Sequence, residues 1–206
     1  MYKKQMKAQK ILCLLAVIVA VILFLYALGI MTDLYDALYS TLKITVTGNE
    51  ETGYGLNVTE RSVAGAKVYT NMQAFDQWLV MASIVYILLA ALLFVTNTNI
   101  RRRYYIGNYV SVGLYTVASL YIVIYAHPYI EAFKARWLAV DFAALKEYSE
   151  TYNSAYTEST LWFDLHYAVF ALMILAAVLL VANTVWKVML MKDEAKLVAE
   201  GKEAKA

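Results

Sequence analysis

Residues 77–126 read QWLVMASIVYILLAALLFVTNTNIRRRYYIGNYVSVGLYTVASLYIVIYA, and this stretch decides the fold. It contains two long apolar runs, Gln77 to Ile100 and Tyr104 to Ala126, which are separated by Arg101, Arg102 and Arg103. Three adjacent guanidinium groups cannot lie in hydrocarbon, because each would cost roughly 2.5 to 3.5 kcal/mol on insertion scales. The arginine triplet therefore predicts a tight turn on one side of a membrane, and it determines the orientation of the whole topology.

The composition of the chain also points to a lipid environment. Of its 206 residues, 62% are hydrophobic and 17% are charged, whereas a soluble domain is about 45 to 50% apolar and about 25% charged. The single cysteine, Cys13, excludes an internal disulfide and every paired-cysteine zinc or redox motif. One proline in the chain leaves little scope for a flexible linker, so we expect no second soluble domain.

Uncharged stretches predict four membrane spans, because about 20 apolar residues cross a hydrocarbon core of about 30 Å. A cleaved signal peptide is the competing interpretation of the first stretch. Its 22 uncharged residues exceed the roughly 7 to 15 of a signal-peptide core, which favours an uncleaved helix. The predicted spans are residues 11–32, 77–100, 104–126 and 167–186.

The distribution of charge predicts the orientation. The side with the termini and the arginine triplet holds 12 Lys/Arg against 4 Asp/Glu. The two large loops, residues 33–76 and 127–166, hold 6 Lys/Arg against 12 Asp/Glu. Because positive residues mark the cytoplasmic side, we predict a multi-pass plasma-membrane protein with both termini and the tail 187–206 in the cytoplasm. Both large loops are then extracellular.

The exterior loops are expected to form a small cap of helical extensions and a short β-hairpin. Alternating apolar and polar residues on either side of a glycine-containing turn predict the hairpin within residues 43–70. In the second loop, apolar residues recur at helical spacing between Tyr129 and Tyr148, which predicts a helix against the outer membrane surface. This stripe consists of Ile130, Phe133, Trp137, either Val140 or Asp141, Ala144 and Tyr148.

The two halves of the chain resemble each other. Residues 89–98 match residues 175–184 in order, including Asn97-Thr98 with Asn183-Thr184. Such ordered polar matches do not follow from an apolar composition. The fold class predicted is therefore an all-α membrane protein, a four-transmembrane-helix bundle built from two duplicated helical hairpins, residues 1–100 and 101–206.

The sequence offers few candidates for chemistry. Asp76 and Asp164 are expected to cap the outer starts of spans two and four, and Asn97 and Asn183 to satisfy terminal carbonyl groups. In an alternative interpretation, His127, Asp164 and His166 lie together and form an exterior metal site, or the site of an enzyme acting at the outer leaflet. We otherwise expect no cofactor and no metal.

Function is predicted largely by exclusion. No ionisable residue lies at the centre of a predicted span, which disfavours ion-coupled transport, and no catalytic or phosphate-binding motif is present. The basic residues on the predicted cytoplasmic side are explained by the topology and by attraction to anionic lipid rather than by binding to nucleic acid.

We therefore expect a non-enzymatic accessory or scaffolding subunit that contacts partner subunits, or other copies of itself, through its exterior loops. The alternative is a channel or transport subunit that forms a neutral pore as an oligomer. Candidate contact residues are Tyr129, Trp137, Tyr148, Tyr152 and Tyr156.

Overall fold

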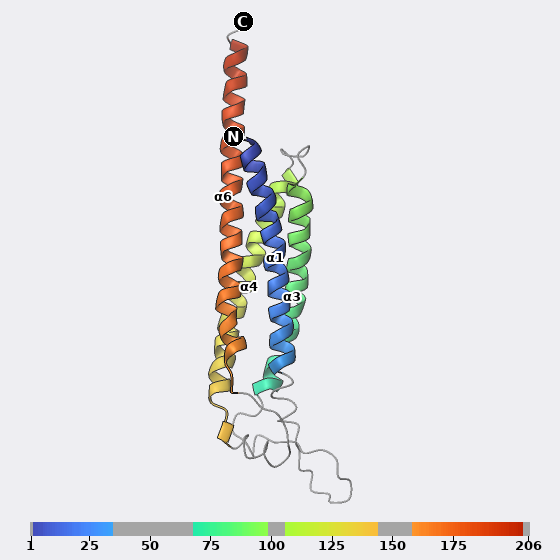
Figure 1. Ribbon diagram of the computed structural model, residues 1–206, viewed down its shortest axis with the longest axis vertical. Coiled ribbons are helices and arrows are strands. Elements are labelled where there is room, and N and C mark those ends of the chain that lie inside the picture. The colour runs from blue at the N-terminus through green and yellow to red at the C-terminus, as the bar shows by residue number, and fades with distance from the viewer. Residues whose placement is uncertain (1, 35–67, 99–105, 144–157, 204–206) are drawn as a thin grey trace, which may run out of the picture. The chain divides into compact units, whose positions relative to one another are not determined.

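The computed structural model describes residues 2–34, 68–98, 106–143 and 158–203 (Figure 1). Nearly all of them lie in four α-helices, and no strand occurs within these ranges. Each helix contains a segment that is long and apolar enough to cross a membrane, which confirms the prediction of an all-α, multi-pass membrane protein. The helices are α1 (Tyr2–Leu34), α3 (Val68–Asn97), α4 (Ile106–Leu138) and α6 (Leu161–Glu203). The predicted β-hairpin and the arginine triplet lie outside the described residues.

Large apolar side chains remain exposed on all four helices. Val95 is 70% exposed, Ile106 74% and Ile124 71%, and many similar residues accompany them. A soluble protein rarely leaves so much contiguous apolar surface in water, whereas hydrocarbon tails solvate it well. Within each helix the backbone groups bond to one another, as a bilayer requires. The exposed surface therefore supports a lipid environment.

The helices extend beyond the predicted spans. Helix α3 begins at Val68, nine residues before Gln77, and α4 continues past Ala126 and through Pro128 to Leu138. The helix predicted to follow Pro128 as a separate exterior element is therefore the C-terminal part of α4. The burial of its apolar stripe is confirmed where it is described, since Ile130, Phe133, Trp137 and Val140 are all buried. The predicted continuation of the helix beyond Leu138 is wrong, because α4 ends there and Val140 lies in the turn that follows.

The chain forms two compact units, and each helix contributes a segment to both. Unit 1 comprises Met1–Ile22, Ile84–Ile122 and Phe170–Ala206, and unit 2 comprises Leu23–Ser83 and Val123–Val169. The two units differ in what holds their helices together.

Side-chain amides connect the helices of unit 1. Gln9 Nε2 donates to Asn97 Oδ1 at 2.8 Å, which links α1 to α3, and Asn97 Nδ2 donates to Ser111 Oγ at 2.8 Å, which links α3 to α4. Gln5 Nε2 lies 3.4 Å from Asn183 Oδ1, where α1 runs beside α6 (Figure 1). Hydrogen bonds and close packing drive association between membrane helices, because burial of apolar surface provides no drive in lipid.

The two asparagines predicted to satisfy terminal carbonyl groups, Asn97 and Asn183, differ from each other in their roles. Asn97 ends α3 and donates to the Leu93 carbonyl at 3.1 Å, so the predicted capping of terminal carbonyls is confirmed for this residue. The prediction is wrong for Asn183, which lies 20 residues before the end of α6. Helix α6 continues well beyond the predicted fourth span, so Asn183 does not lie at its end. The Asn183 side chain contacts Gln5 of α1 instead.

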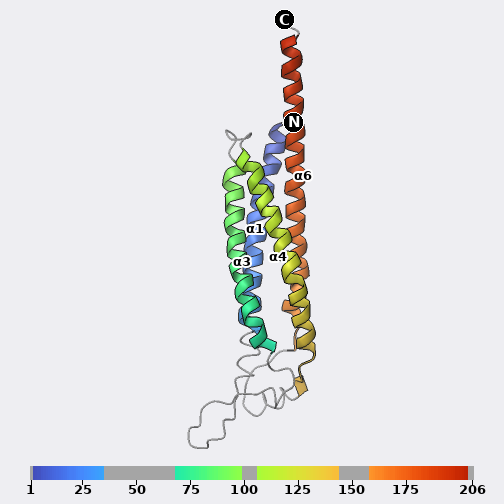
Figure 2. The ribbon, with the colours of Figure 1, turned by 180° about the vertical axis from the view of Figure 1, so that it is seen from behind.

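Aromatic side chains dominate unit 2. Trp162 of α6 lies directly on Gly29 of α1, where any side chain would collide with the indole ring. Trp137 of α4 packs against Phe163 of α6, with ring centroids 5.6 Å apart. In this unit the α4 segment lies beside the start of α6 (Figure 2). The contact between α4 and α6 carries the polar cluster described next.

Candidate functional site

The first turn of α6 is fixed by polar contacts. The Leu161 N–H donates to Ser159 Oγ at 3.2 Å, so Ser159 caps the helix. Asp164 lies in the same first turn, where its Oδ2 accepts a hydrogen bond from Thr160 Oγ1 at 2.8 Å. Its Oδ1 lies 2.5 Å from Lys134 Nζ of α4. Asp164 thus complements the helix dipole from within the first turn, and its carboxylate pairs with a lysine.

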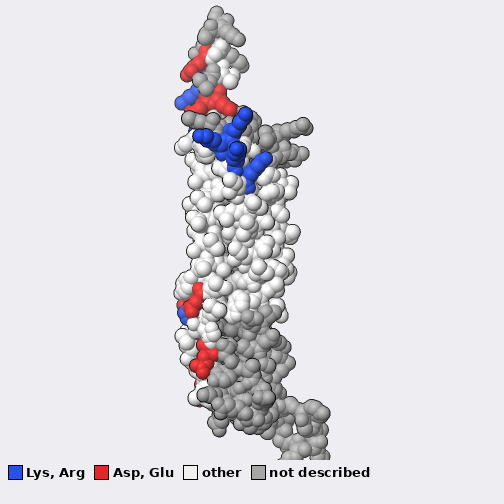
Figure 3. Space-filling model, viewed as in Figure 1, with Lys and Arg blue, Asp and Glu red and all other residues white. Residues whose placement is uncertain are grey.

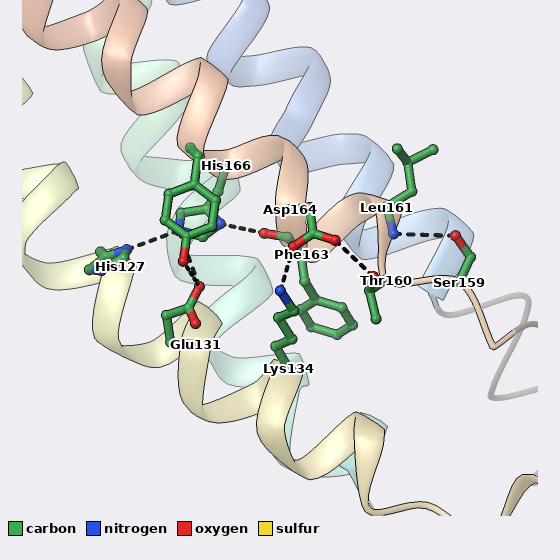
Figure 4. Close-up of polar contacts among 10 residues, drawn as sticks. His127, Glu131, Lys134, Ser159, Thr160, Leu161, Phe163, Asp164 and His166 are labelled. Atoms are coloured by element: carbon green, nitrogen blue, oxygen red, sulfur yellow. Dashed lines mark hydrogen bonds and ion pairs between the residues drawn. The ribbon is translucent and has the colours of Figure 1, made fainter.

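The cluster centres on His127 and Glu131 of α4 and His166 of α6 (Figure 4). His127 Nδ1 lies 2.9 Å from His166 Nε2, and Glu131 Oε1 lies 3.7 Å from the same Nε2. His166 is fully buried, Glu131 is partly buried and His127 is exposed. His127 and Glu131 are four residues apart, so one face of α4 presents both toward α6.

The backbone determines which nitrogen of His166 carries a proton. His166 Nδ1 is hydrogen-bonded to the Phe163 carbonyl oxygen. A carbonyl oxygen can only accept, so Nδ1 carries the hydrogen and the neutral ring has its lone pair on Nε2. That lone pair faces His127 and Glu131.

Tyr167 supports the cluster from the neighbouring position on α6. Its hydroxyl donates to Glu131 Oε1 at 2.7 Å, and its ring centroid lies 4.1 Å from that of His166. The hydroxyl therefore holds the Glu131 carboxylate in place. Two imidazoles and one oriented carboxylate form a set of donors suited to a transition-metal cation.

The structure brings together part of the predicted site and replaces the rest. His127 and His166 meet, as the metal alternative expected, but the third candidate ligand is Glu131, because Lys134 and Thr160 hold Asp164. Sequence reasoning missed Glu131 because it ended the third span before Pro128. Had the helix been carried through the proline, the spacing of four residues would have placed His127 and Glu131 on one face.

The predicted contact residues have different environments. Tyr129 is 44% exposed and lines a groove of about 370 Å³ on unit 2, together with Pro128, Ala132, Phe133 and Arg136. Trp137 is fully buried, which removes it from any contact surface; its ring packs on Phe163. Tyr148, Tyr152 and Tyr156 lie outside the described residues.

Asp76 does not cap a helix, so that prediction is wrong. Helix α3 begins eight residues earlier, at Val68, and the Asp76 side chain is fully buried in unit 2. Within the described part of the chain, neither carboxylate oxygen has a hydrogen-bond partner.

Charged side chains are distributed unevenly. Lys3, Lys4, Lys7 and Lys10 are exposed on the first turns of α1, and Figure 3 shows basic side chains gathered there. Unit 2 contains Asp76, Glu131, Asp141, Glu158 and Asp164 among its described residues. Among the described residues, most of the lysines and arginines therefore lie in unit 1, and more of the acidic residues lie in unit 2 than in unit 1. Lys134 and Arg136 belong to unit 2, and Asp193, Glu194 and Glu200 belong to unit 1.

Comparison of the chain with protein-family models, with curated proteins and with solved structures finds no match. Any assignment of function therefore depends on the chemistry of the residues themselves.

Proposed function

We propose that this chain is a non-enzymatic accessory or scaffolding subunit of a plasma-membrane complex, and that it contacts its partner through its exterior segments. The observation that carries the proposal is the groove around Tyr129, which was a predicted contact residue and is exposed. The groove combines Tyr129 with Arg136, and tyrosine and arginine are enriched among the residues that contribute most to binding. The apolar wall of Phe133 completes it.

The chemistry of the groove indicates what would fill it. The Arg136 guanidinium carbon lies 5.7 Å from the centroid of the Phe133 ring, so a cation borders an apolar surface. A polypeptide segment with an apolar side chain next to a carboxylate would complement both. We therefore propose a segment of a second membrane subunit as the occupant.

The charge distribution supports the orientation that this function needs. Exposed lysines at the start of α1 favour the cytoplasmic side for unit 1, by the preference of positive charge for that side. The acidic residues of unit 2 are consistent with an exterior location. Membrane-impermeant lysine reagents applied to intact cells should modify residues of the exterior loops and spare Lys192 and Lys196 of the tail. Labelling of the tail alone would reverse the orientation.

Photo-crosslinking would test the proposed contact. A photoreactive amino acid at position 129, introduced in the native host, should give one reproducible crosslink to another membrane protein. That protein should also co-purify with the unmodified chain in mild detergent, and the crosslink should weaken when Arg136→Glu is added. The matched control is position 117 on the same helix, where Val117 is 64% exposed. Equal crosslinking at both positions, or a chain that always purifies alone, would contradict the proposal.

The finer prediction of two duplicated hairpins also stays a proposal. It is supported by the matched asparagines, since both are buried in unit 1 and each contacts a glutamine of α1. The pair Phe75-Asp76 of the first half parallels Phe163-Asp164 of the second half. The two aspartates differ, because Asp76 is buried whereas Asp164 is exposed and paired with Lys134. An experimental structure in which residues 1–100 superpose on residues 101–206 would establish the duplication.

The alternative function is a channel or transport subunit that forms a neutral pore as an oligomer. The polar side chains inside unit 1 are the observation that bears on it. They bond to one another between helices, which favours a role in helix packing over a role in lining a conduit. Purified protein in liposomes should therefore give no ion or solute flux above that of empty vesicles. Reproducible flux would favour the pore.

A further inference from the structure

We propose that His127, Glu131 and His166 bind a divalent first-row transition-metal cation, with zinc as the best match. The proposal goes beyond the accessory function, and it concerns the chain alone. A partner is not needed to test it, so its failure and the failure of the partner contact are distinguishable.

The spacing of the donor atoms fits a metal. One atom from each residue can be chosen so that all three lie within 4.8 Å of one another. A tetrahedral zinc ion with nitrogen and oxygen ligands at about 2.0 to 2.1 Å places those ligands about 3.3 Å apart. The two distances from His166 Nε2, 2.9 Å to His127 Nδ1 and 3.7 Å to Glu131 Oε1, lie on either side of that value. Shifts of a few tenths of an ångström would bring both of these pairs to that value, and the third pair, between His127 and Glu131, lies within 4.8 Å.

The groups around the cluster orient the donors. Metal-binding histidines nearly always donate their other ring N–H to a carbonyl or a carboxylate, which fixes the tautomer. His166 does this through Nδ1 and the Phe163 carbonyl. The Glu131 carboxylate is held in turn by the Tyr167 hydroxyl. A second layer of contacts thus exists for the buried imidazole and for the carboxylate.

The donor set selects the class of cation. Imidazole nitrogens suit zinc and its first-row neighbours, whereas magnesium and calcium require oxygen ligands. His127 is exposed, so the rest of the chain does not close the site off from an ion. Three protein ligands leave a fourth position for water or for a ligand from another molecule.

A bound ion would affect the neighbouring groove. It would tie α4 to α6, because two ligands come from one helix and the third comes from the other. Pro128 and Tyr129 line the groove and directly follow His127 along α4. The metal would therefore fix the turn of helix that presents the proposed contact surface.

Zinc titration of the purified full chain tests the site. The protein should carry a purification tag without histidine, be stripped with a chelator and be placed in lipid nanodiscs. Zinc is then added against a chromogenic chelator, and Co²⁺ is added separately to record visible absorption. We expect one equivalent of zinc per chain and the Co²⁺ spectrum of a four-coordinate site with nitrogen and oxygen ligands.

Variants assign the ligands. His127→Ala changes an exposed residue and should leave the fold intact, and Glu131→Gln keeps an acceptor for Tyr167. Each should weaken zinc affinity by at least about 100-fold, because loss of a ligand exceeds the roughly 10- to 100-fold effect of an outer contact. Tyr167→Phe should weaken it by about 10-fold. Asp164→Asn is the matched control and should change nothing.

The outcomes are decisive in either direction. Stoichiometric zinc that is lost in His127→Ala and Glu131→Gln but kept in Asp164→Asn would support the site. The proposal is overturned if the wild-type chain takes up no stoichiometric zinc, or if both ligand variants bind it like the wild type. Circular dichroism of each variant separates loss of the site from loss of helix.

Discussion

Units 1 and 2 differ in the polar groups that they bury. Unit 1 uses amides and hydroxyls that bond to one another, centred on Asn97. Unit 2 uses aromatic rings for packing and places ionisable groups, among them His127 and His166, at the contact of α4 and α6. Neutral groups hold helices together without titrating, whereas ionisable groups within a membrane protein mark candidate sites of function.

The difference between neutral polar groups in unit 1 and ionisable groups in unit 2 is one of degree. Unit 1 also buries the Lys187 side chain, whose Nζ lies 5.2 Å from the centroid of the Tyr109 ring. A cation over an aromatic face is attracted by the ring quadrupole. Even so, the contacts that join three helices of unit 1 are neutral. We therefore expect substitutions in unit 1 to act on stability and those in the polar cluster of unit 2 to act on binding.

The largest expected effect is from Asn97→Ala in unit 1. This change removes the hydrogen bonds to Gln9 and Ser111, and so weakens contacts of α3 with both α1 and α4. Interhelical hydrogen bonds average about 0.6 and reach about 1.7 kcal/mol each, and a stranded amide adds to the loss. We expect the free energy of unfolding to fall by about 3 kcal/mol, as measured by reversible unfolding in mixed micelles.

Thr98→Ala is the matched control for Asn97. Thr98 directly follows the last residue of α3, and its hydroxyl donates to the Phe94 carbonyl of that same helix at 2.8 Å. No other side-chain bond of Thr98 is seen in the described part of the chain. Its loss should lower the free energy of unfolding by less than about 0.5 kcal/mol. If the two variants were equally stable, the amide cluster could not be what holds unit 1 together.

Gly29→Ala probes the packing of unit 2 and should have the second-largest effect. A methyl group at this position would collide with the Trp162 ring, so α1 and α6 would have to separate or the indole would have to move. Overpacking of this kind costs about 1 to 3 kcal/mol, and we expect a loss of about 2 kcal/mol in the same unfolding measurement.

Gly113→Ala controls for the change of residue type. Gly113 also lies within a helix, α4, but nothing lies within 4 Å of the site where its Cβ would be. Alanine is the better helix former by about 1 kcal/mol, so this variant should be as stable as the wild type or more so. A loss of similar size at both glycines would mean that the indole contact is unimportant.

Much of the fold could be predicted from the sequence because hydrocarbon offers no hydrogen-bond partners to the backbone. Long uncharged stretches must be helices, and this alone predicted α1, α3, α4 and α6. The helix ends could not be predicted in the same way. Composition marks where apolar residues stop, but a helix continues wherever its residues pack, as at Val68 of α3 and beyond Pro128 of α4.

The candidate site was only half predictable, for a related reason. His127 and His166 were found because histidine is rare in the chain, with 2 in all. Glu131 was overlooked because its role depends on the continuity of α4 and on Tyr167, which lies 36 positions away. Pairing across helices is set by packing, and no pattern within a single segment encodes it.

Of the three main variants, Asn97→Ala, Gly29→Ala and Asp76→Asn, the last should produce the smallest effect, and its sign should be opposite. The carboxylate is fully buried in unit 2, and neither oxygen has a hydrogen-bond partner within the described ranges. Burying a charge without a partner is unfavourable, whereas an amide of the same shape carries no charge. We expect the free energy of unfolding to rise by about 1 kcal/mol.

Glu158→Gln, at an exposed acidic residue of the same unit, is the control for loss of a charge and should change the free energy of unfolding little. If Asp76→Asn instead lowers the free energy of unfolding, the buried carboxylate contributes to stability, and unit 2 then contains a second ionisable site besides the histidine cluster.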